Sequence, residues 1–360
     1  MDAPFMEIDR PGLEFAVNSY TPGEGLVWQR LFPLRFTPRF DIKGIEGNEG
    51  IPVSANRVAF NSRAPKKSRQ KIGSWNGKLG KIAVSRSKDE LEINEYKDLQ
   101  TIAASSNDPG TANYLIDLVY DDVDFCNKAM DYKVEIDALR IACSGKATYK
   151  REIDGDLVTD DEIDFNIPEK NFKGVKVAWS NADEADALKD IADAQDAIAK
   201  QGLPKPMYCY MEKAKWEEIC AQKATARRLF PRYEQSMVTA DMITNESVNS
   251  YMSGKGYPRI IVLDTYASVE DEKGKITTFK PWDVDIVVLS RTENLGYTYH
   301  KTVPDVENTE ALQTHGAYYK MTRYSEVNPM EETTMAEAYV QCALTNRRSL
   351  VLINTTKTTW

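Results

Sequence analysis

The spacing of apolar residues along the chain changes several times, and its longest regular stretch predicts a helix. From Leu115 to Ile141 the apolar positions recur at intervals of three or four residues, which is the period of an α-helix with one buried face. Gly145 follows this stretch, and glycine is the residue most often found just past a helix end. About thirty-five residues at about 1.5 Å each make a rod of roughly 50 Å. The pattern therefore predicts a long helix that forms a spine.

A shorter helix is predicted immediately before this spine. Ser87 and Glu90 have the three-residue spacing of a capping box, and apolar residues then recur at roughly helical intervals as far as Ile102. The sequence Asn-Asp-Pro-Gly at 107–110 interrupts the period, because proline fits poorly inside a helix. We therefore expect the helix to kink or to restart at this point.

After Gly145 the period shortens to two residues, which is typical of strands. Residues 148–150 and 162–167 alternate between apolar and polar, and Asp-Gly-Asp at 154–156 is a turn signal between them. This pattern predicts a β-hairpin attached directly to the end of the spine.

The block 181–300 mixes the two periods and is predicted to be an α/β unit. Helices are expected near 181–202, around Trp216 and near 241–252, and strands are expected at 207–211, 259–263 and 284–289. The last of these strands is apolar enough to be central in a sheet. Two further strands, at 317–321 and 350–353, are expected to return to the body of the protein.

Residues 1–48 show neither period. They contain five prolines and five glycines, and these residues remove backbone donors and weaken regular elements. The segment is therefore predicted to be an extended arm, without a packed sheet or a long helix. Its apolar patch of Trp28, Leu31 and Phe32 has to bury against the body or against a neighbouring copy. We predict that these three residues take part in contacts between copies.

Charge is distributed unevenly between one basic segment and the rest of the chain. The formal net charge is −9, but residues 51–88 contain no Asp or Glu and carry ten basic residues, so the remainder carries −19. Short strands are expected at 57–60 and 81–85, with a polar, glycine-containing excursion between them that is too polar to form its own core. The segment is predicted to be an extended loop that contacts a neighbouring copy through Arg57, Arg63, Lys66, Lys67, Arg69, Lys71, Trp75 and Lys78.

Residues that carry chemistry are sparse and lack the spacing of known sites. The chain has only two histidines, His300 and His315, and neither lies in a metal or catalytic motif. The five cysteines show no CxxC spacing, and neither a P-loop nor a dinucleotide-binding glycine motif is present. The acidic run at 154–164 has its glycine in the wrong place for an EF-hand and is interpreted as a solvated hairpin turn. We therefore predict no catalytic residue, no metal site and no cofactor.

The basic segment allows two functional interpretations. As a nucleic-acid binder it would neutralise phosphates with Arg and Lys, and Trp75 could stack on a base. Against this, the acidic remainder of the chain would repel a polyanion, whereas it would attract the basic loop of a second copy. Assembly is therefore favoured, and nucleic-acid binding through 51–88 is the alternative. An enzyme site that assembles only in three dimensions within 181–300 is a second alternative. No run of 18 apolar residues and no secretory signal is seen.

The order of the parts resembles the major capsid protein E family of lambda-like tailed phages, which has the Hong Kong 97-type fold. The order runs from a proline-rich arm through a basic loop, a long helix, an acidic hairpin and an α/β block to returning strands. The resemblance spans roughly residues 26–355. The segments that carry it are 56–87 with Ala-Pro at 64–65, Leu-Glu-Ile-Asn at 91–94, Trp-Ser-Asn-Ala-Asp at 179–183 and Gly-Tyr-Thr-Tyr at 296–299.

The resemblance implies an α+β fold, Hong Kong 97-like, with an extended N-terminal arm, an extended β-hairpin loop, a long spine helix in a peripheral domain, and an α/β axial domain. The implied division is an arm at 1–48, a basic loop at 49–88, a peripheral domain at 89–180, an axial domain at 181–300 and returning strands at 301–360.

The resemblance also implies a structural function without enzymatic activity. Copies of the chain would form hexamers and pentamers of an icosahedral phage head around double-stranded DNA. The expected partners are the chain itself, portal and scaffold proteins and, in some phages, decoration proteins. Packaged DNA would be contacted weakly if at all, and no membrane is involved. The expected location is the virion capsid, assembled in the host cytoplasm.

Overall fold

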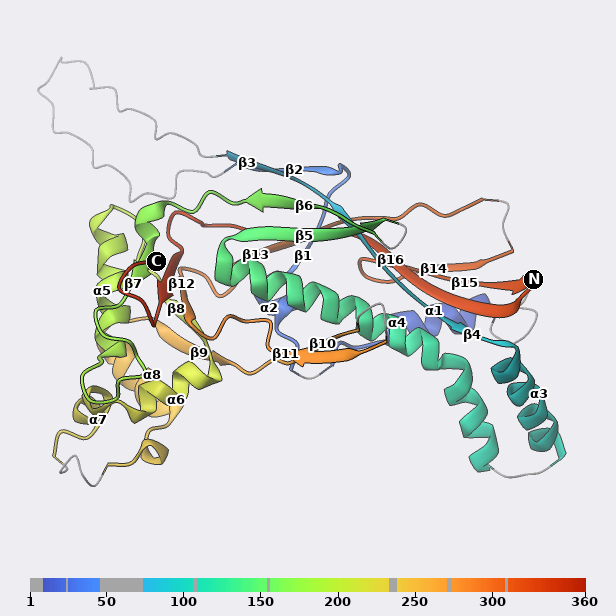
Figure 1. Cartoon of the computed structure of the whole chain (residues 1–360), viewed down its shortest axis with the longest axis horizontal. Helices are drawn as coiled ribbons and strands as arrows, with labels where there is room; N and C mark the ends of the chain where they lie inside the picture. Colours follow the sequence, from blue (N-terminus) through green and yellow to red (C-terminus); the bar gives the residue numbers. More distant parts are fainter. Residues whose placement is uncertain are drawn as a thin grey trace, which may run out of the picture.

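The computed structural model describes residues 9–23, 25–45, 74–105, 109–153, 156–232, 238–270, 274–307 and 310–360. Its described elements form an elongated molecule that combines helices with two main sheets (Figure 1). Helix α4 (Pro109–Ser144) follows the long axis. Helix α3 (Glu90–Ser105) lies beside the start of α4 at one end of the molecule, remote from the second sheet.

Helix α4 confirms the predicted spine. It is 36 residues long, and Gly145 follows it with φ +72° while its N–H donates to Ile141 O at 2.9 Å. A side chain would be strained at that φ, so glycine ends the helix here. The helix begins at Pro109, because proline is tolerated in a first turn where its missing N–H has no partner to lose.

The larger sheet has six strands and packs one face on α4. Its strand order is β1-β13-β16-β15-β14, and β4 pairs with the other edge of β16. The bounds are β1 (Leu34–Phe36), β4 (Gly80–Lys88), β13 (Gly296–Lys301), β14 (Leu312–His315), β15 (Lys320–Val327) and β16 (Met330–Leu344). The predicted strand at 81–85 lies within β4 and pairs with β16. It therefore belongs to the larger sheet and not to a separate excursion.

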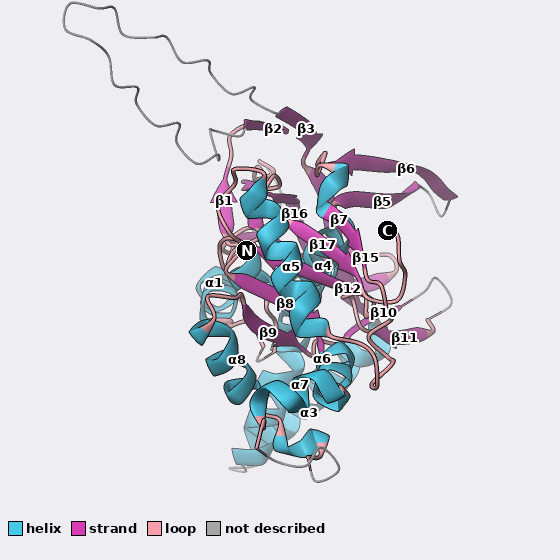
Figure 2. Ribbon diagram, turned by 90° about the vertical axis from the view of Figure 1, so that its left-hand side faces the viewer, coloured by secondary structure: helices cyan, strands magenta, loops and turns pink. Residues whose placement is uncertain are grey.

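The smaller sheet belongs to the α/β unit that the sequence predicts. Its order is β7-β17-β12-β8-β9, with β7 (Phe172–Gly174), β8 (Tyr208–Glu212), β9 (Arg259–Leu263), β12 (Ile286–Ser290) and β17 (Val351–Asn354). All five residues of the central strand β12 are buried. Helices α5 (Ala187–Lys200), α6 (Lys213–Ala221), α7 (Lys223–Leu229) and α8 (Asn245–Gly254) gather around this sheet (Figure 2).

Three two-stranded hairpins complete the described fold. The predicted hairpin after the spine is β5 (Lys146–Ile153) with β6 (Asp156–Asp164). The other two are β2 (Asp41–Ile45) with β3 (Ser74–Lys78), and β10 (Ala267–Glu270) with β11 (Ile276–Phe279). No helix among the described residues is long and apolar enough to cross a membrane.

The N-terminal segment differs from the predicted extended arm. It contains α1 (Arg10–Ser19) and the single turn α2 (Trp28–Leu31), and β1 and β2 follow. The Asp9 side chain caps α1 by accepting from Gly12 N at 2.8 Å, and Pro11 lies in the first turn. Proline content was misleading here because a proline in the first turn favours a helix start.

Candidate assembly surfaces

The three apolar residues predicted to join copies are buried inside their own chain. Trp28, Leu31 and Phe32 are each 0% exposed and belong to the core that α4 and the six-stranded sheet share. Leu31 O accepts a hydrogen bond from Leu295 N at 2.8 Å, and Phe32 O accepts one from the Thr298 hydroxyl at 2.8 Å. This corrects the sequence prediction: side chains with no exposed surface cannot contact another copy in this conformation.

A buried carboxylate on the spine holds this segment in place. Glu135 of α4 accepts hydrogen bonds from Val27 N at 3.1 Å and Trp28 N at 2.7 Å, and thereby caps α2. Its side chain is 0% exposed. Burial raises the pKa of Glu135 to about 7, and the hydrogen bonds from Val27 and Trp28 oppose that rise.

Glu135 is one of three buried polar residues that lie four positions apart on the same face of α4. Asn127 Oδ1 accepts from the Tyr319 hydroxyl at 2.6 Å, and Asp131 Oδ1 accepts from the Tyr318 hydroxyl at 2.8 Å. Sequence reasoning missed this stripe, although a spacing of four residues within an otherwise apolar helix face is a signal that it could have used. The stripe ties the N-terminal segment and the turn before β15 to the spine.

Ion pairs connect the inner face of the larger sheet with α4. Arg323 of β15 pairs with Glu332 of β16, each only 1% exposed, and Arg323 also donates to Val119 O of α4 at 3.2 Å. Lys88 of β4 pairs with Asp122 of α4, and both side chains are buried. Buried pairs of this kind cost much more when one partner is lost than they contribute as a pair.

Most of the predicted basic loop residues lie outside the described residues, namely Arg57, Arg63, Lys66, Lys67, Arg69 and Lys71. The two that the structure describes separate from each other. Trp75 of β3 is only 4% exposed and packs edge-on against Phe165 with ring centroids 4.9 Å apart. Lys78 at the end of β3 is exposed. Trp75 therefore anchors the base of this segment to the chain's own core, and its ring is not free to stack on a base.

The outer face of the larger sheet carries aromatic and cationic side chains. Successive residues of a strand point to opposite faces of the sheet. In β4, β13 and β16, one set of alternate residues faces α4 and the other set points outward. Lys301, Tyr339 and Lys81 stand side by side across three strands. We call this surface the aromatic–cationic face and define it by Arg35, Phe40, Tyr297, Tyr299, Lys301 and Tyr339.

Cation–π contacts organise the aromatic–cationic face. The guanidinium of Arg35 lies 5.1 Å from the Tyr297 ring and 5.7 Å from the Tyr299 ring. Lys301 Nζ lies 4.0 Å above the Phe40 ring, which packs edge-on against Tyr339. Arg35 is exposed and Phe40 is 44% exposed, so this face is open to a partner.

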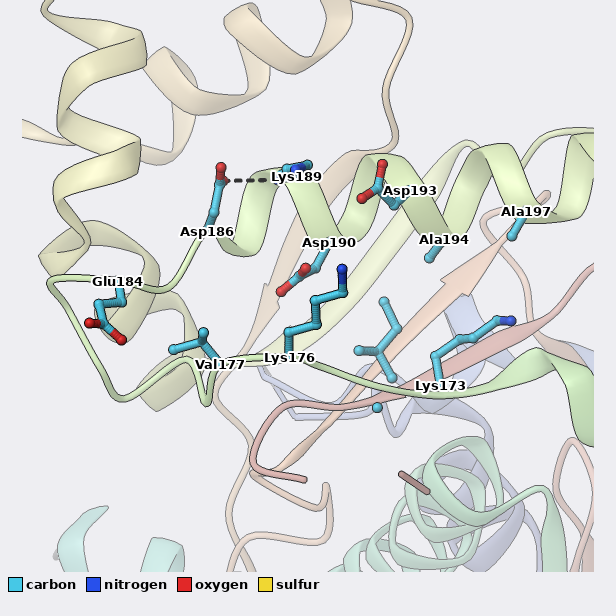
Figure 3. Close-up of a pocket in the computed structure, with 12 residues that line it drawn as sticks. Lys173, Lys176, Val177, Glu184, Asp186, Lys189, Asp190, Asp193, Ala194 and Ala197 are labelled. Carbon is cyan, nitrogen blue, oxygen red and sulfur yellow. Dashed lines mark hydrogen bonds between the residues drawn. The ribbon is translucent and has the colours of Figure 1, made fainter. Parts of the chain in front are cut away.

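A cavity of about 420 Å³ lies between α5 and the segment 173–177 (Figure 3). Lys173 and Lys176 project from the segment, while Asp186 and Asp190 project from the start of α5. The two carboxylates already have partners: Asp190 accepts from Trp179 Nε1 at 2.9 Å, and Asp186 pairs with Arg228. These two carboxylates therefore connect the start of α5 to Trp179 and to Arg228 within the α/β unit.

Side chains that could bind a metal ion do not gather in the part of the chain that the structure describes. No group of three or more His, Cys, Asp or Glu side chains there could hold a metal ion. The cysteines are buried, and burial raises the pKa of Cys126 to about 12, which keeps its thiol protonated at neutral pH. His300 is half-buried, and burial lowers its pKa.

Comparison with solved structures identifies the fold. A prophage protein from E. coli CFT073 that is assigned as a capsid protein is 17% identical, with 94% of each chain covered and a TM-score of 0.53. A phage-related protein from Bordetella bronchiseptica RB50 is 15% identical, with 96% of each chain covered and a TM-score of 0.52. The sequence matches none of the curated proteins. The fold is thus the mixed helix-and-sheet fold of the Hong Kong 97 type.

A family model decides the identity of the chain. The model of phage major capsid protein E matches residues 15–354, which is nearly the whole sequence and includes the spine, both main sheets and the α/β unit. This match agrees with the order of parts in the sequence, with the spine helix and with the fold. The chain therefore belongs to the phage major capsid protein E family.

Proposed function

We propose that this chain builds the wall of an icosahedral phage head, as hexamers and pentamers around double-stranded DNA, and has no enzymatic role. The observation that carries the proposal is the family match over residues 15–354. A closed shell is stabilised by many modest contacts that symmetry repeats, so each subunit needs extended surfaces and no catalytic pocket. The larger sheet and the spine helix are suited to that task because they pack against each other along the long axis of the molecule (Figure 1).

The peripheral and axial domains that we propose correspond to the two hydrophobic cores of the subunit. One core joins α4 to the larger sheet and supports a peripheral domain of residues 89–180 together with the returning strands of 301–360. The other surrounds β8, β9 and β12 with α5 and α8 and supports an axial domain of residues 181–300 near the capsomer centre. Val351 and Ile353 of β17 complete the second core, so the last strand of the chain is shared with this unit.

The basic segment 49–88 reaches onto a neighbouring copy in this proposal. Its charge favours an acidic surface, and the residues outside 51–88 together carry −19. Trp75 at its base is held by Phe165, which gives the segment a fixed point of departure from the subunit. Further partners are portal and scaffold proteins and, in some phages, decoration proteins. Assembly takes place in the host cytoplasm.

Electron microscopy of the purified protein, alone and after co-expression with neighbouring phage genes, tests the shell function. We expect closed polyhedral shells, tubes or flat sheets of capsomers. A protein that stays monomeric under all these conditions contradicts the proposal, and a DNA-binding titration over a range of salt concentrations then tests the alternative.

A triple charge reversal tests the basic loop separately. The variant with Lys66→Glu, Lys67→Glu and Arg69→Glu is expected to yield a folded subunit that does not form shells. The matched control reverses three exposed lysines outside the basic segment, Lys170, Lys200 and Lys255, with the same change in net charge. Normal shells from the loop variant, or equal failure of the control, exclude a specific role of the loop.

A further inference from the structure

Among the residues that the structure describes, Arg35 and Lys301 of the aromatic–cationic face have no anionic partner. Within the residues that the structure describes, the guanidinium of Arg35 and the ammonium of Lys301 contact aromatic rings. Neither group forms a salt bridge with a described carboxylate. By contrast, Lys81 on the same face pairs with Glu337 at 2.6 Å. The aromatic rings hold these two cations in place, and no described carboxylate neutralises them. They therefore favour the binding of an anionic partner.

The composition of this face is that of a protein-binding surface. Tyrosine and arginine are the residue types that dominate the binding energy of interfaces, because they bury a large area at a low cost in side-chain entropy. Tyr297, Tyr299 and Tyr339 are half-buried, so their rings are already positioned by the sheet. A partner that covers them therefore gains apolar contact without having to order flexible side chains.

Helix α3 carries a surface of complementary chemistry. Leu91, Glu95, Asp98 and Ile102 follow one another at intervals of four, three and four residues, which places them on one side of the helix. All four are exposed, with Leu91 at 77% and Ile102 at 52%. The opposite side buries Ile93 and Tyr96. The exposed stripe of α3 thus offers two carboxylates flanked by two apolar groups.

The two surfaces cannot meet within one chain. Helix α3 lies at one end of the elongated molecule, whereas β1 and β13 lie toward the opposite half (Figure 1). A contact between two different surfaces of identical chains is heterologous, and such contacts generate rings when their rotation closes. The basic segment 51–88 of a neighbour is a poor occupant of the face, because Arg35 and Lys301 would repel it.

We propose that the aromatic–cationic face docks the exposed stripe of helix α3 from a second copy of this chain, a contact that rests on the proposed shell function. Glu95 and Asp98 face Arg35 and Lys301 in this contact, while Leu91 and Ile102 cover exposed aromatic rings such as Phe40. The acids supply specificity and register, and the apolar groups supply the buried area.

Reciprocal charge reversal tests this pairing. Arg35→Glu with Lys301→Glu is expected to lower the yield of shells or capsomer sheets in electron micrographs by about tenfold or more, which corresponds to one lost contact of modest strength. Glu95→Lys with Asp98→Lys is expected to do the same. The combination of all four substitutions leaves the net charge unchanged and is expected to restore assembly.

Two controls separate a failed contact from a failed fold or a failed function. Thermal unfolding of the unassembled variants is expected to match the unaltered protein, and Lys170→Glu with Lys200→Glu matches the charge change of the first variant on exposed lysines elsewhere. If the unaltered protein assembles and the reversed variants assemble equally well, or if the fourfold variant stays unassembled, this contact is wrong while the shell function stands. An unaltered protein that never assembles contradicts the shell function itself.

Discussion

Trp28 and Phe40 come from the same N-terminal segment, yet their side chains have opposite surroundings. Trp28 is 0% exposed beneath the spine, and its ring packs edge-on against Tyr318 with centroids 5.5 Å apart. Phe40 is 44% exposed on the outer face of the sheet, with Lys301 Nζ 4.0 Å above its ring. The segment thus contributes one aromatic residue to the core and another to an open surface.

The difference arises from the elements that receive the two parts of the segment. Around Trp28 the spine provides Glu135, which accepts the backbone N–H groups that burial would otherwise leave without a partner. Phe40 follows β1, which has joined the edge of the sheet beside β13, and it packs where the outward side chains of β13 and β16 stand. The position of each residue, beneath the spine or on the outer face of the sheet, therefore separates the core aromatic from the surface aromatic.

The largest loss of stability is expected for Trp28→Ala. Removal of a fully buried indole leaves a cavity beneath the spine, and we expect the free energy of unfolding of the unassembled subunit to fall by about 3 to 5 kcal/mol. Denaturation in urea measures the change. A loss below about 1 kcal/mol would mean that the N-terminal segment is not part of the stable core in solution.

Ion pairs on the two faces of the larger sheet extend the comparison. Arg323→Met removes the buried guanidinium that pairs with Glu332, and we expect a loss of about 3 kcal/mol in the free energy of unfolding. Replacing both residues, with Glu332→Leu added, is expected to recover most of that loss because neither charge of this pair then remains. The matched surface variant Lys81→Met breaks a pair whose lysine side chain is 55% exposed, and we expect it to cost less than about 1 kcal/mol.

The pH dependence of stability tests the role of Glu135. A carboxyl whose pKa is about 7 in the folded chain and 4.5 in the reference state binds its proton more tightly when folded. Its contribution is therefore fully present below about pH 4.5 and is lost as the pH rises through 7, which lowers stability by roughly 2 to 3 kcal/mol between pH 5 and pH 8. Glu135→Gln cannot titrate, and we expect this part of the pH dependence to disappear from urea denaturation curves. An unchanged pH profile would show that Glu135 does not titrate in this range.

The smallest effect on stability is expected for Phe40→Ala. Its ring is partly exposed, so the free energy of unfolding should fall by less than about 1 kcal/mol. Assembly measured by electron microscopy should nevertheless decline, because the ring belongs to the face that we propose for docking. A large loss of stability would place Phe40 with Trp28 and would remove the distinction between the two aromatic residues.

Several elements could be predicted from local pattern because their period and their ends lie within a short stretch. The spine, the hairpin after it, α5, β8, β9 and β12 were all expected close to where they lie. Helix α1 was missed because prolines and glycines of 1–48 were counted without regard to position, although Pro11 occupies a first helical turn. The loop residues from Arg57 to Lys71 lie outside the described residues, so their role remains a prediction.

The order of the elements, the uneven distribution of charge and the family resemblance could be predicted without the structure. Each of these depends on residue type and spacing alone. The tertiary structure decided which neighbours each element received. Trp28 became a core residue because Glu135, more than one hundred positions later, lies beside it. Arg35 and Lys301 came together because β1 pairs in parallel with β13. Contacts between residues far apart in sequence depend on chain closure over long loops, and no local period encodes them.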